Sequence, residues 1–157
     1  MILKESYSKE RIAEFRNYAD FNKSDPAIIE KMIRAFVLLE HLSNSKLNFV
    51  FKGGTCMILL LNHPNRFSID IDILTTVTRE ELEQKLDFVI NNSEFTHYKL
   101  DKKRSYDGNI PKAHYKFYWT DERKDYILLD ILFEEHKYPE IIQTEIQTDW
   151  LISKAPY

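Results

Sequence analysis

The sequence predicts an α+β (α/β) fold, with helices and two strands in the first part of the chain and strands in the rest. Three observations support this prediction. Apolar residues recur at three- and four-residue spacing over residues 27–43, which is the period of an amphipathic helix. Polar and apolar residues alternate over 67–73, which is the period of a half-buried strand. After residue 91 the patterned segments are typical of strands.

Composition limits the class of protein. A chain of 157 residues favours one domain, 1–157, with its own core. The formal net charge is −3, so any contact with nucleic acid must come from a local patch. Cys56 is the only cysteine, which excludes an intrachain disulfide. The polar N-terminus does not resemble a secretory signal, and the longest apolar run, 57–61, cannot span a membrane. We therefore expect a cytoplasmic protein without a membrane partner.

The N-terminal part is predicted to be helical. Residues 1–23 are charged and show weak helical periodicity. A capping side chain followed by proline at 24–26 predicts the start of a helix, which extends over 27–43. We therefore expect a helical N-terminal segment of about residues 1–45 before the rest of the domain.

Two strand–helix pairs are predicted next. The apolar run 47–51 predicts a buried strand, and 55–62 predicts a short buried helix that ends at His63-Pro64-Asn65. The alternating segment 67–75 predicts the second strand. Apolar residues at helical spacing predict a helix over 79–91.

The last part of the chain is predicted to form strands. Three segments alternate or run apolar, namely residues 95–101, 113–120 and 126–134. The polar turn 121–125 predicts an antiparallel hairpin between the last two of them. The polar segment 102–112 predicts a loop, and 141–146 predicts a final strand.

Two of the three glycines are adjacent and follow the first predicted strand. Gly53 and Gly54 can adopt positive φ and can let backbone N–H groups approach a phosphate closely. The helix that follows would direct its N-terminus at the same anion. Lys52 and Arg66 would neutralise the remaining phosphate charge. The alternative is a simple turn with two surface charges nearby.

Two carboxylates lie on one face of the second predicted strand. Residues i and i+2 of a strand project on the same side, roughly 6.5–7 Å apart, so Ser68, Asp70 and Asp72 share the polar face. Carboxylates suit Mg²⁺, which prefers oxygen ligands. The alternative is a solvated strand face, with Ser68 a small polar strand residue.

Asp130 is a candidate third acid. It lies within the apolar run 126–133, where an unpaired carboxylate is costly to bury. A metal shared with Asp70 and Asp72 would offset that cost and complete a two-metal site, with ions roughly 3.5–4 Å apart. The alternatives are that Asp130 faces water at the sheet edge or pairs with an arginine. Together, the glycines, cations and acids favour in-line displacement at an α-phosphate.

Other chemistry is disfavoured. The five histidines are scattered without the spacing of metal ligands. Cys56, at the start of an apolar helix, is interpreted as a small core residue rather than a nucleophile.

Residues 97–124 combine basic and aromatic side chains, which suits RNA or single strands. The basic residues are Lys99, Lys102, Lys103, Arg104, Lys112, Lys116, Arg123 and Lys124, and the aromatic ones are Tyr98, Tyr106, Tyr115, Phe117, Tyr118 and Trp119. Acids in or beside the segment weaken the signal. The alternative is a solvated sheet face with half of the rings in the core.

The block Phe51-Lys52-Gly53-Gly54-Thr55 followed by Arg66-Phe67-Ser68-Ile69-Asp70-Ile71-Asp72 resembles the AbiEii/AbiGii-type nucleotidyltransferase toxin family, within the polymerase β-like superfamily. The family pattern is Lys-Gly-Gly-Thr, a short helix, then Arg-x-Ser-x-Asp-x-Asp, and this sequence matches each position. The resemblance covers about residues 28–135. It implies a nucleotidyltransferase fold, a mixed β-sheet flanked by helices.

The resemblance also implies a function, namely transfer of a nucleotidyl group from an NTP with Mg²⁺ (or Mn²⁺). The implied metal ligands and catalytic residues are Asp70, Asp72 and Asp130, and the implied nucleotide-binding residues are Lys52, Gly53, Gly54, Thr55, Arg66 and Ser68. The favoured acceptor is tRNA, and a cognate antitoxin is the expected partner. The family's C-terminal helical half is expected to be absent from this chain. The alternative function is a catalytically silent nucleotide- or antitoxin-binding module.

Overall fold

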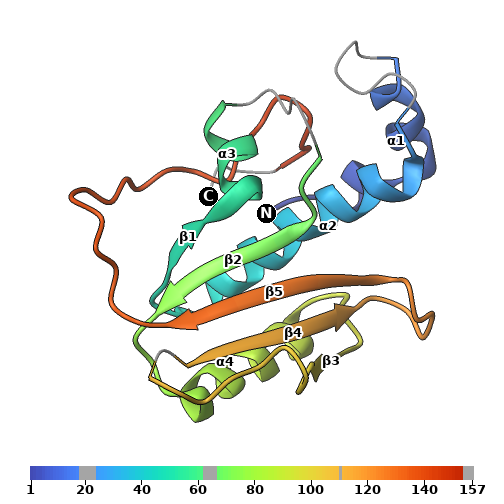
Figure 1. The fold of residues 1–157 in the computed structure, drawn as a ribbon. Helices are drawn as coiled ribbons and strands as arrows, with labels where there is room; N and C mark the ends of the chain where they lie inside the picture. The colour runs from blue at the N-terminus through green and yellow to red at the C-terminus, as the bar shows by residue number, and fades with distance from the viewer. Residues whose placement is uncertain (18–23, 62–66, 110, 154–157) are drawn as a thin grey trace.

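The structure, a computed structural model, describes residues 1–17, 24–61, 67–109 and 111–153. It contains a five-stranded mixed sheet flanked by helices, so the predicted α+β fold is confirmed (Figure 1). In chain order the elements are η1 (Lys4–Tyr7), α1 (Lys9–Phe15), α2 (Pro26–Asn44), β1 (Val50–Lys52), α3 (Gly53–Leu61), β2 (Asp70–Thr75), α4 (Arg79–Asn92), β3 (His97–Leu100), β4 (Lys112–Tyr118) and β5 (Tyr126–Phe133).

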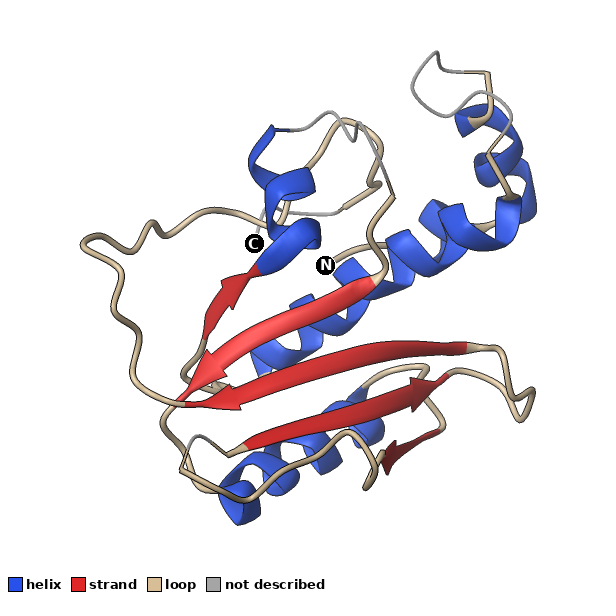
Figure 2. Ribbon diagram, viewed as in Figure 1, coloured by secondary structure: helices blue, strands red, loops and turns tan. Residues whose placement is uncertain are grey.

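The sheet order is β1-β2-β5-β4-β3 (Figure 2). The predicted hairpin is present, because β4 pairs antiparallel with β5. On its other side β5 pairs parallel with β2, and this is the parallel pair in an otherwise antiparallel sheet. The parallel pairing brings together two segments about 60 residues apart in the chain, Asp70–Thr75 and Tyr126–Phe133.

The long helices begin at capping residues and cover one face of the sheet. The Asp25 side chain accepts from the N–H of Ala27 at the start of α2, and Thr78 caps α4 in the same way. α4 contacts the face that carries Tyr98 and Tyr115, whose hydroxyls donate to acids of that helix. α2 packs beside α4. Both helices lie behind the sheet in Figure 1, so neither covers the opposite face.

The core lies between that face and the two helices. Fully buried side chains from the sheet meet others from α2 and α4, as alternation and helical periodicity predict. The largest of them include Tyr115, Phe117, Phe36, Ile71, Ile73, Met32 and Leu82. Tyr115 and Phe117 come from the basic–aromatic segment 97–124, so part of its aromatic content serves packing.

The predicted strand at 141–146 is wrong, because residues 134–149 form no strand. Ile141 and Ile142 are exposed, at 42% and 69%, and neither belongs to a strand of the described sheet. The segment is nevertheless anchored further on. Ile146 is buried, and the Trp150 ring packs on Phe36 with centroids 5.2 Å apart.

Several predicted boundaries shift by a few residues. β1 begins at Val50 rather than 47, and β2 begins at Asp70 rather than 67. α3 begins at Gly53, directly after β1, so no loop separates them. The predicted helix end at 63–65 lies outside the described residues. Within the described chain, no helix has the length and apolar character needed to cross a bilayer.

Candidate active site

Four polar side chains form a row across the sheet. Lys52 of β1 is the register partner of Asp72 of β2, Asp72 is the partner of Asp130 of β5, and Asp130 is the partner of His114 of β4. Neighbouring strands lie about 4.8 Å apart, and register partners share a face. Tyr115, next to His114, points toward α4, so the row lies on the face that α2 and α4 leave open.

Asp70 lies on the same face, two residues before Asp72 and opposite Leu128. Burial raises the pKa of Asp70, and the negative charges of Asp130 and Asp72 raise it further. Burial also raises the pKa of Asp72, with Lys52 opposing the rise and Asp130 adding to it. The three carboxylates therefore lie close enough for their negative charges to repel one another.

Asp130 neither faces open water nor pairs with an arginine. Its carboxylate contacts Nδ1 of His114, and the two side chains are only 21% and 14% exposed. An ionised carboxylate only accepts hydrogen bonds, so Nδ1–H of His114 donates to it. Sequence reasoning missed His114 because it grouped the histidines by spacing in the chain rather than by strand register.

Gly53 is held against Asp72. Its φ is +83°, in the region that residues with a Cβ rarely adopt, and a Cβ at this position would overlap the Asp72 carboxylate. Among the described glycines it is the one with positive φ, and Gly54 lies within α3. Gly53 therefore lets the chain turn from β1 into α3 directly beside an acid of the row.

Thr55 and Ser68 tie α3 to β2. Thr55 is fully buried, and its hydroxyl donates to the backbone carbonyl of Asp70 at 2.6 Å. Since a hydroxyl has one proton, the 3.0 Å contact between Thr55 and Ser68 requires Ser68 to donate to Thr55. In the structure both residues position the start of the acidic strand. Arg66, predicted to bind phosphate, lies outside the described residues.

Asp70, Asp72 and Asp130 would hold a divalent metal. Half-buried carboxylates whose charges repel each other suit a hard cation, because the cation would relieve that repulsion. Across the described residues, however, no three His, Cys, Asp or Glu side chains are close enough together to hold a metal ion as they stand. The donor chemistry fits, and binding would require these side chains to converge.

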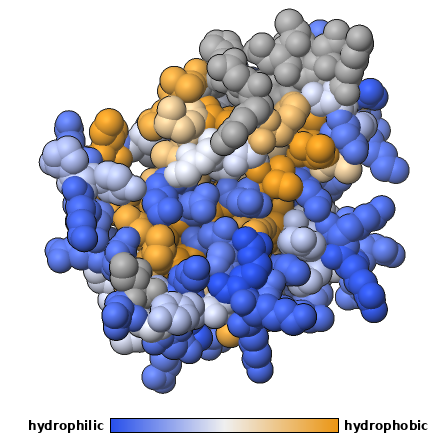
Figure 3. Space-filling model, viewed as in Figure 1, coloured by the Kyte–Doolittle hydropathy of each residue, from blue (hydrophilic) through white to orange (hydrophobic). Residues whose placement is uncertain are grey.

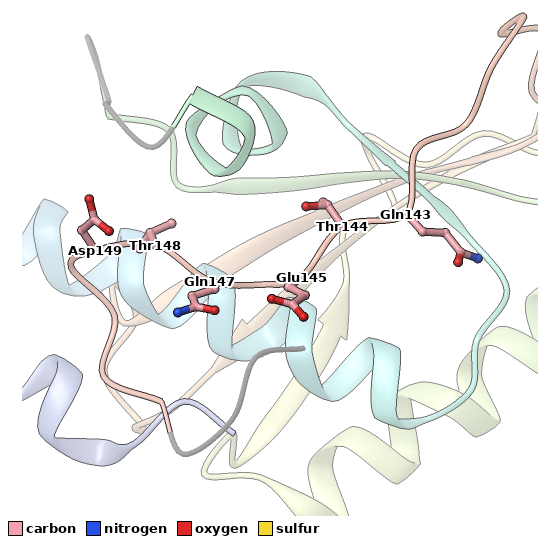
Figure 4. Close-up of a pocket in the computed structure, with 6 residues that line it drawn as sticks. All are labelled: Gln143, Thr144, Glu145, Gln147, Thr148 and Asp149. Atoms are coloured by element: carbon pink, nitrogen blue, oxygen red, sulfur yellow. The ribbon is translucent and has the colours of Figure 1, made fainter.

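A polar pocket of about 500 Å³ lies elsewhere, along the C-terminal segment, and is shown in Figure 4. Its lining residues are Gln143, Thr144, Glu145, Gln147, Thr148 and Asp149. Thr148 and Asp149 point to one side of the segment and Glu145 and Gln147 to the other. Because these polar groups do not converge and none is a predicted site residue, the row on the open sheet face remains the candidate site.

Comparison with known proteins identifies the family. The family model described as Nucleotidyl transferase AbiEii toxin, Type IV TA system, matches residues 37–154. This range spans well over half of the chain and includes all five strands, α3 and α4. Comparisons with curated proteins and with solved structures gave no match. With the resemblance of its glycine and acidic segments and its mixed sheet, the chain belongs to the AbiEii nucleotidyltransferase toxin family.

Proposed function

We propose that this chain is a metal-dependent nucleotidyltransferase domain of a toxin–antitoxin system, which transfers a nucleotidyl group from an NTP to an acceptor hydroxyl, with tRNA as the favoured acceptor. The observation that carries the proposal is the row Lys52–Asp72–Asp130 beside Gly53, with Asp70 on the same face. The family supports the reaction class and implies an antitoxin as partner.

In the proposed reaction the acceptor oxygen bonds to the α-phosphorus while the bond from that phosphorus to the bridging oxygen breaks, and pyrophosphate leaves with its electron pair. The acceptor proton passes to a carboxylate, for which Asp130 is the candidate because His114 holds it in place. Lys52 and the backbone at Gly53 and Gly54 would bind the triphosphate. Bound Mg²⁺ or Mn²⁺ would neutralise the phosphate charge as it develops.

Calorimetric titration of NTPs in the presence and absence of Mg²⁺ tests the proposed site. We expect affinity to depend on Mg²⁺, and we expect Asp70→Asn and Asp72→Asn each to weaken Mg²⁺-dependent binding about tenfold or more, because each removes a charged oxygen ligand. The matched control is Asp121→Asn, an exposed acid in the turn between β4 and β5. Unchanged affinity in both site variants would refute the metal role of this pair.

One observation favours a second candidate function. A preformed two-metal site would require acidic side chains that converge on one point, and the described acidic side chains do not converge in this way. A catalytically silent module that binds nucleotide or antitoxin needs no such convergence. A nucleotide-binding module of this kind would bind NTP in the titration above, whereas an antitoxin-binding one would not, and neither would give a transfer product with any acceptor.

A further inference from the structure

The open face of the sheet continues beyond the acids into a cluster of lysines and tyrosines. Alternation places Lys116 and Tyr118 of β4 on the same face as His114, and Tyr126 of β5 on the same face as Asp130. Tyr118 and Tyr126 are register partners, with ring centroids 5.6 Å apart. In Figure 3, which views this face, hydrophilic side chains extend across the middle and lower part of the molecule, with hydrophobic surface around α3 and between them.

Three ammonium groups lie against these two rings. Nζ of Lys31, from α2, and Nζ of Lys116 are each 5.0 Å from the centroid of the Tyr126 ring. Nζ of Lys99, on β3, is 5.7 Å from the centroid of the Tyr118 ring. We call Lys31, Lys99, Lys116, Tyr118 and Tyr126 the lysine–tyrosine patch. Cation–π contacts of this kind hold the ammonium groups close together before any ligand binds.

The patch keeps most of its positive charge. Lys116 has one acid within 4 Å, Asp101 at 3.9 Å, and in the described structure no acid pairs with Lys31 or Lys99. Asp107, an acid of the basic–aromatic segment 97–124, pairs with Arg79 rather than with a lysine of the patch. Three like charges with only one acid within 4 Å among the described residues favour a polyanionic ligand.

The patch adjoins the acids on the sheet. Asp70, Leu128 and Lys116 are successive register partners across β2, β5 and β4, so the backbones of Asp70 and Lys116 lie about 10 Å apart. Lys31 and Lys116 lie against the same Tyr126 ring, two residues before Leu128 on β5, so Lys31 belongs to the same end of the sheet. A ligand bound at the patch therefore lies beside the site of the proposed transfer.

We propose that the lysine–tyrosine patch binds the phosphodiester backbone of a single-stranded nucleic acid and so delivers an acceptor hydroxyl to the carboxylates. Lys31, Lys99 and Lys116 contact phosphates, and Tyr118 and Tyr126 hold those lysines in place. His97, on the edge strand β3, stacks on Tyr118 with centroids 4.5 Å apart and planes 2° apart, so its ring extends this aromatic surface to the sheet edge, where a base can stack. The acceptor role rests on the proposed function, whereas the binding itself does not.

The test is fluorescence anisotropy of a labelled short single-stranded RNA with the full chain, in EDTA and without NTP, over a series of salt concentrations. The variant Lys31→Gln/Lys99→Gln/Lys116→Gln removes three charges and keeps most of each side-chain stem. We expect it to bind about tenfold or more weakly, with the slope of log K against log salt reduced by about 2, since each phosphate contact contributes about 0.7 for single strands.

The matched control is Lys9→Gln/Lys46→Gln/Lys85→Gln, which makes the same change in net charge away from the patch and should bind like the wild type. Lys99→Glu, at an exposed edge position, is a second variant if the triple variant fails to fold. Equal RNA affinity in wild type and patch variant, or an equal loss in the control, overturns the proposal. The proposal is also overturned if poly-glutamate binds through the three lysines and RNA does not. That result would assign the patch to an acidic protein.

Failure of this proposal is distinguishable from failure of the proposed function. The RNA titration contains no nucleotide and no metal, and the variants retain Asp70 and Asp72. If Mg²⁺-dependent NTP binding is absent, the RNA result is still valid. If RNA binding is absent, the NTP result is still valid.

Discussion

Asp70 shows how the fold places a carboxylate where its charge is disfavoured. Burial and the charges of Asp130 and Asp72 raise its pKa above the ordinary value of 3.8. The folded protein therefore holds this proton more tightly than the unfolded chain. The resulting stability is complete below the ordinary carboxyl pKa and is lost as the pH rises through the folded-state pKa. At neutral pH without metal, the charged Asp70 lowers the free energy of unfolding.

Replacing this carboxylate should therefore stabilise the metal-free protein. In EDTA at neutral pH, we expect Asp70→Asn to raise the melting temperature, by about 2–4 °C for each kcal/mol of repulsion removed. The gain should shrink as the pH falls toward the ordinary carboxyl pKa, where the wild-type side chain is itself neutral. Thermal melts from neutral to acidic pH measure this, with Asp121→Asn as the control. A lower melting temperature at neutral pH would contradict the account.

At the scale of elements, the junction between β1 and α3 depends on two glycines in different ways. Gly53 has φ +83° and leaves no room for a Cβ beside Asp72, whereas Gly54 lies in the first turn of α3. We expect Gly53→Ala to lower the free energy of unfolding by about 1–2 kcal/mol or more, from backbone strain alone. Gly54→Ala should leave the free energy of unfolding unchanged or raise it by up to about 1 kcal/mol, because alanine favours helix.

Urea denaturation of both variants tests this difference. The Gly53 variant should also lose Mg²⁺-dependent NTP affinity, since the added methyl group displaces Asp72. If the two alanine variants have equal stability, then neither the backbone conformation nor the contact with Asp72 governs this junction.

Local signals predicted the helices well but not the strand register. The start signal at 24–26 and the helical spacing of apolar residues place the ends of α2 and α4 within a residue or two of the observed ones. The predicted hairpin, by contrast, closes between residues 120 and 126, which would put Lys116 opposite Asp130. In the structure β4 ends at Tyr118, which places His114 there instead. A shift of two residues keeps the same face, so alternation cannot detect it.

The proximity of the acids could be predicted only in part. Alternation places Asp70 and Asp72 on one face because it is a local property of the strand. The pairing of β2 with β5 is a long-range contact between segments distant in the sequence. This pairing places Asp130 opposite Asp72, and local patterns do not predict it. The sequence marked Asp130 as anomalous within an apolar run, and the fold supplies its neighbours.

At the scale of the whole molecule, the sheet divides the chain into two sides. Helices α2 and α4 cover one face and build the core (Figure 1). The other face carries the acids and the strand residues of the lysine–tyrosine patch, and Lys31 reaches the Tyr126 ring from α2. On the open face Lys52 lies on one side of the acids and Lys116 on the other. An acidic centre between two positive groups suits a reaction that joins two phosphate-bearing substrates.

The most direct measurement of the central claim is transfer of label to RNA from NTPs that carry the label at the α-phosphate. Each NTP is incubated with the chain, total tRNA and Mg²⁺, with EDTA and Asp72→Asn as controls. The account predicts that at least one NTP labels RNA, that EDTA abolishes the labelling, and that Asp72→Asn lowers its rate by about 10²-fold or more, as loss of a central charge-stabilising group does. Labelling that persists in EDTA or in Asp72→Asn, or no labelling with any NTP, would contradict it.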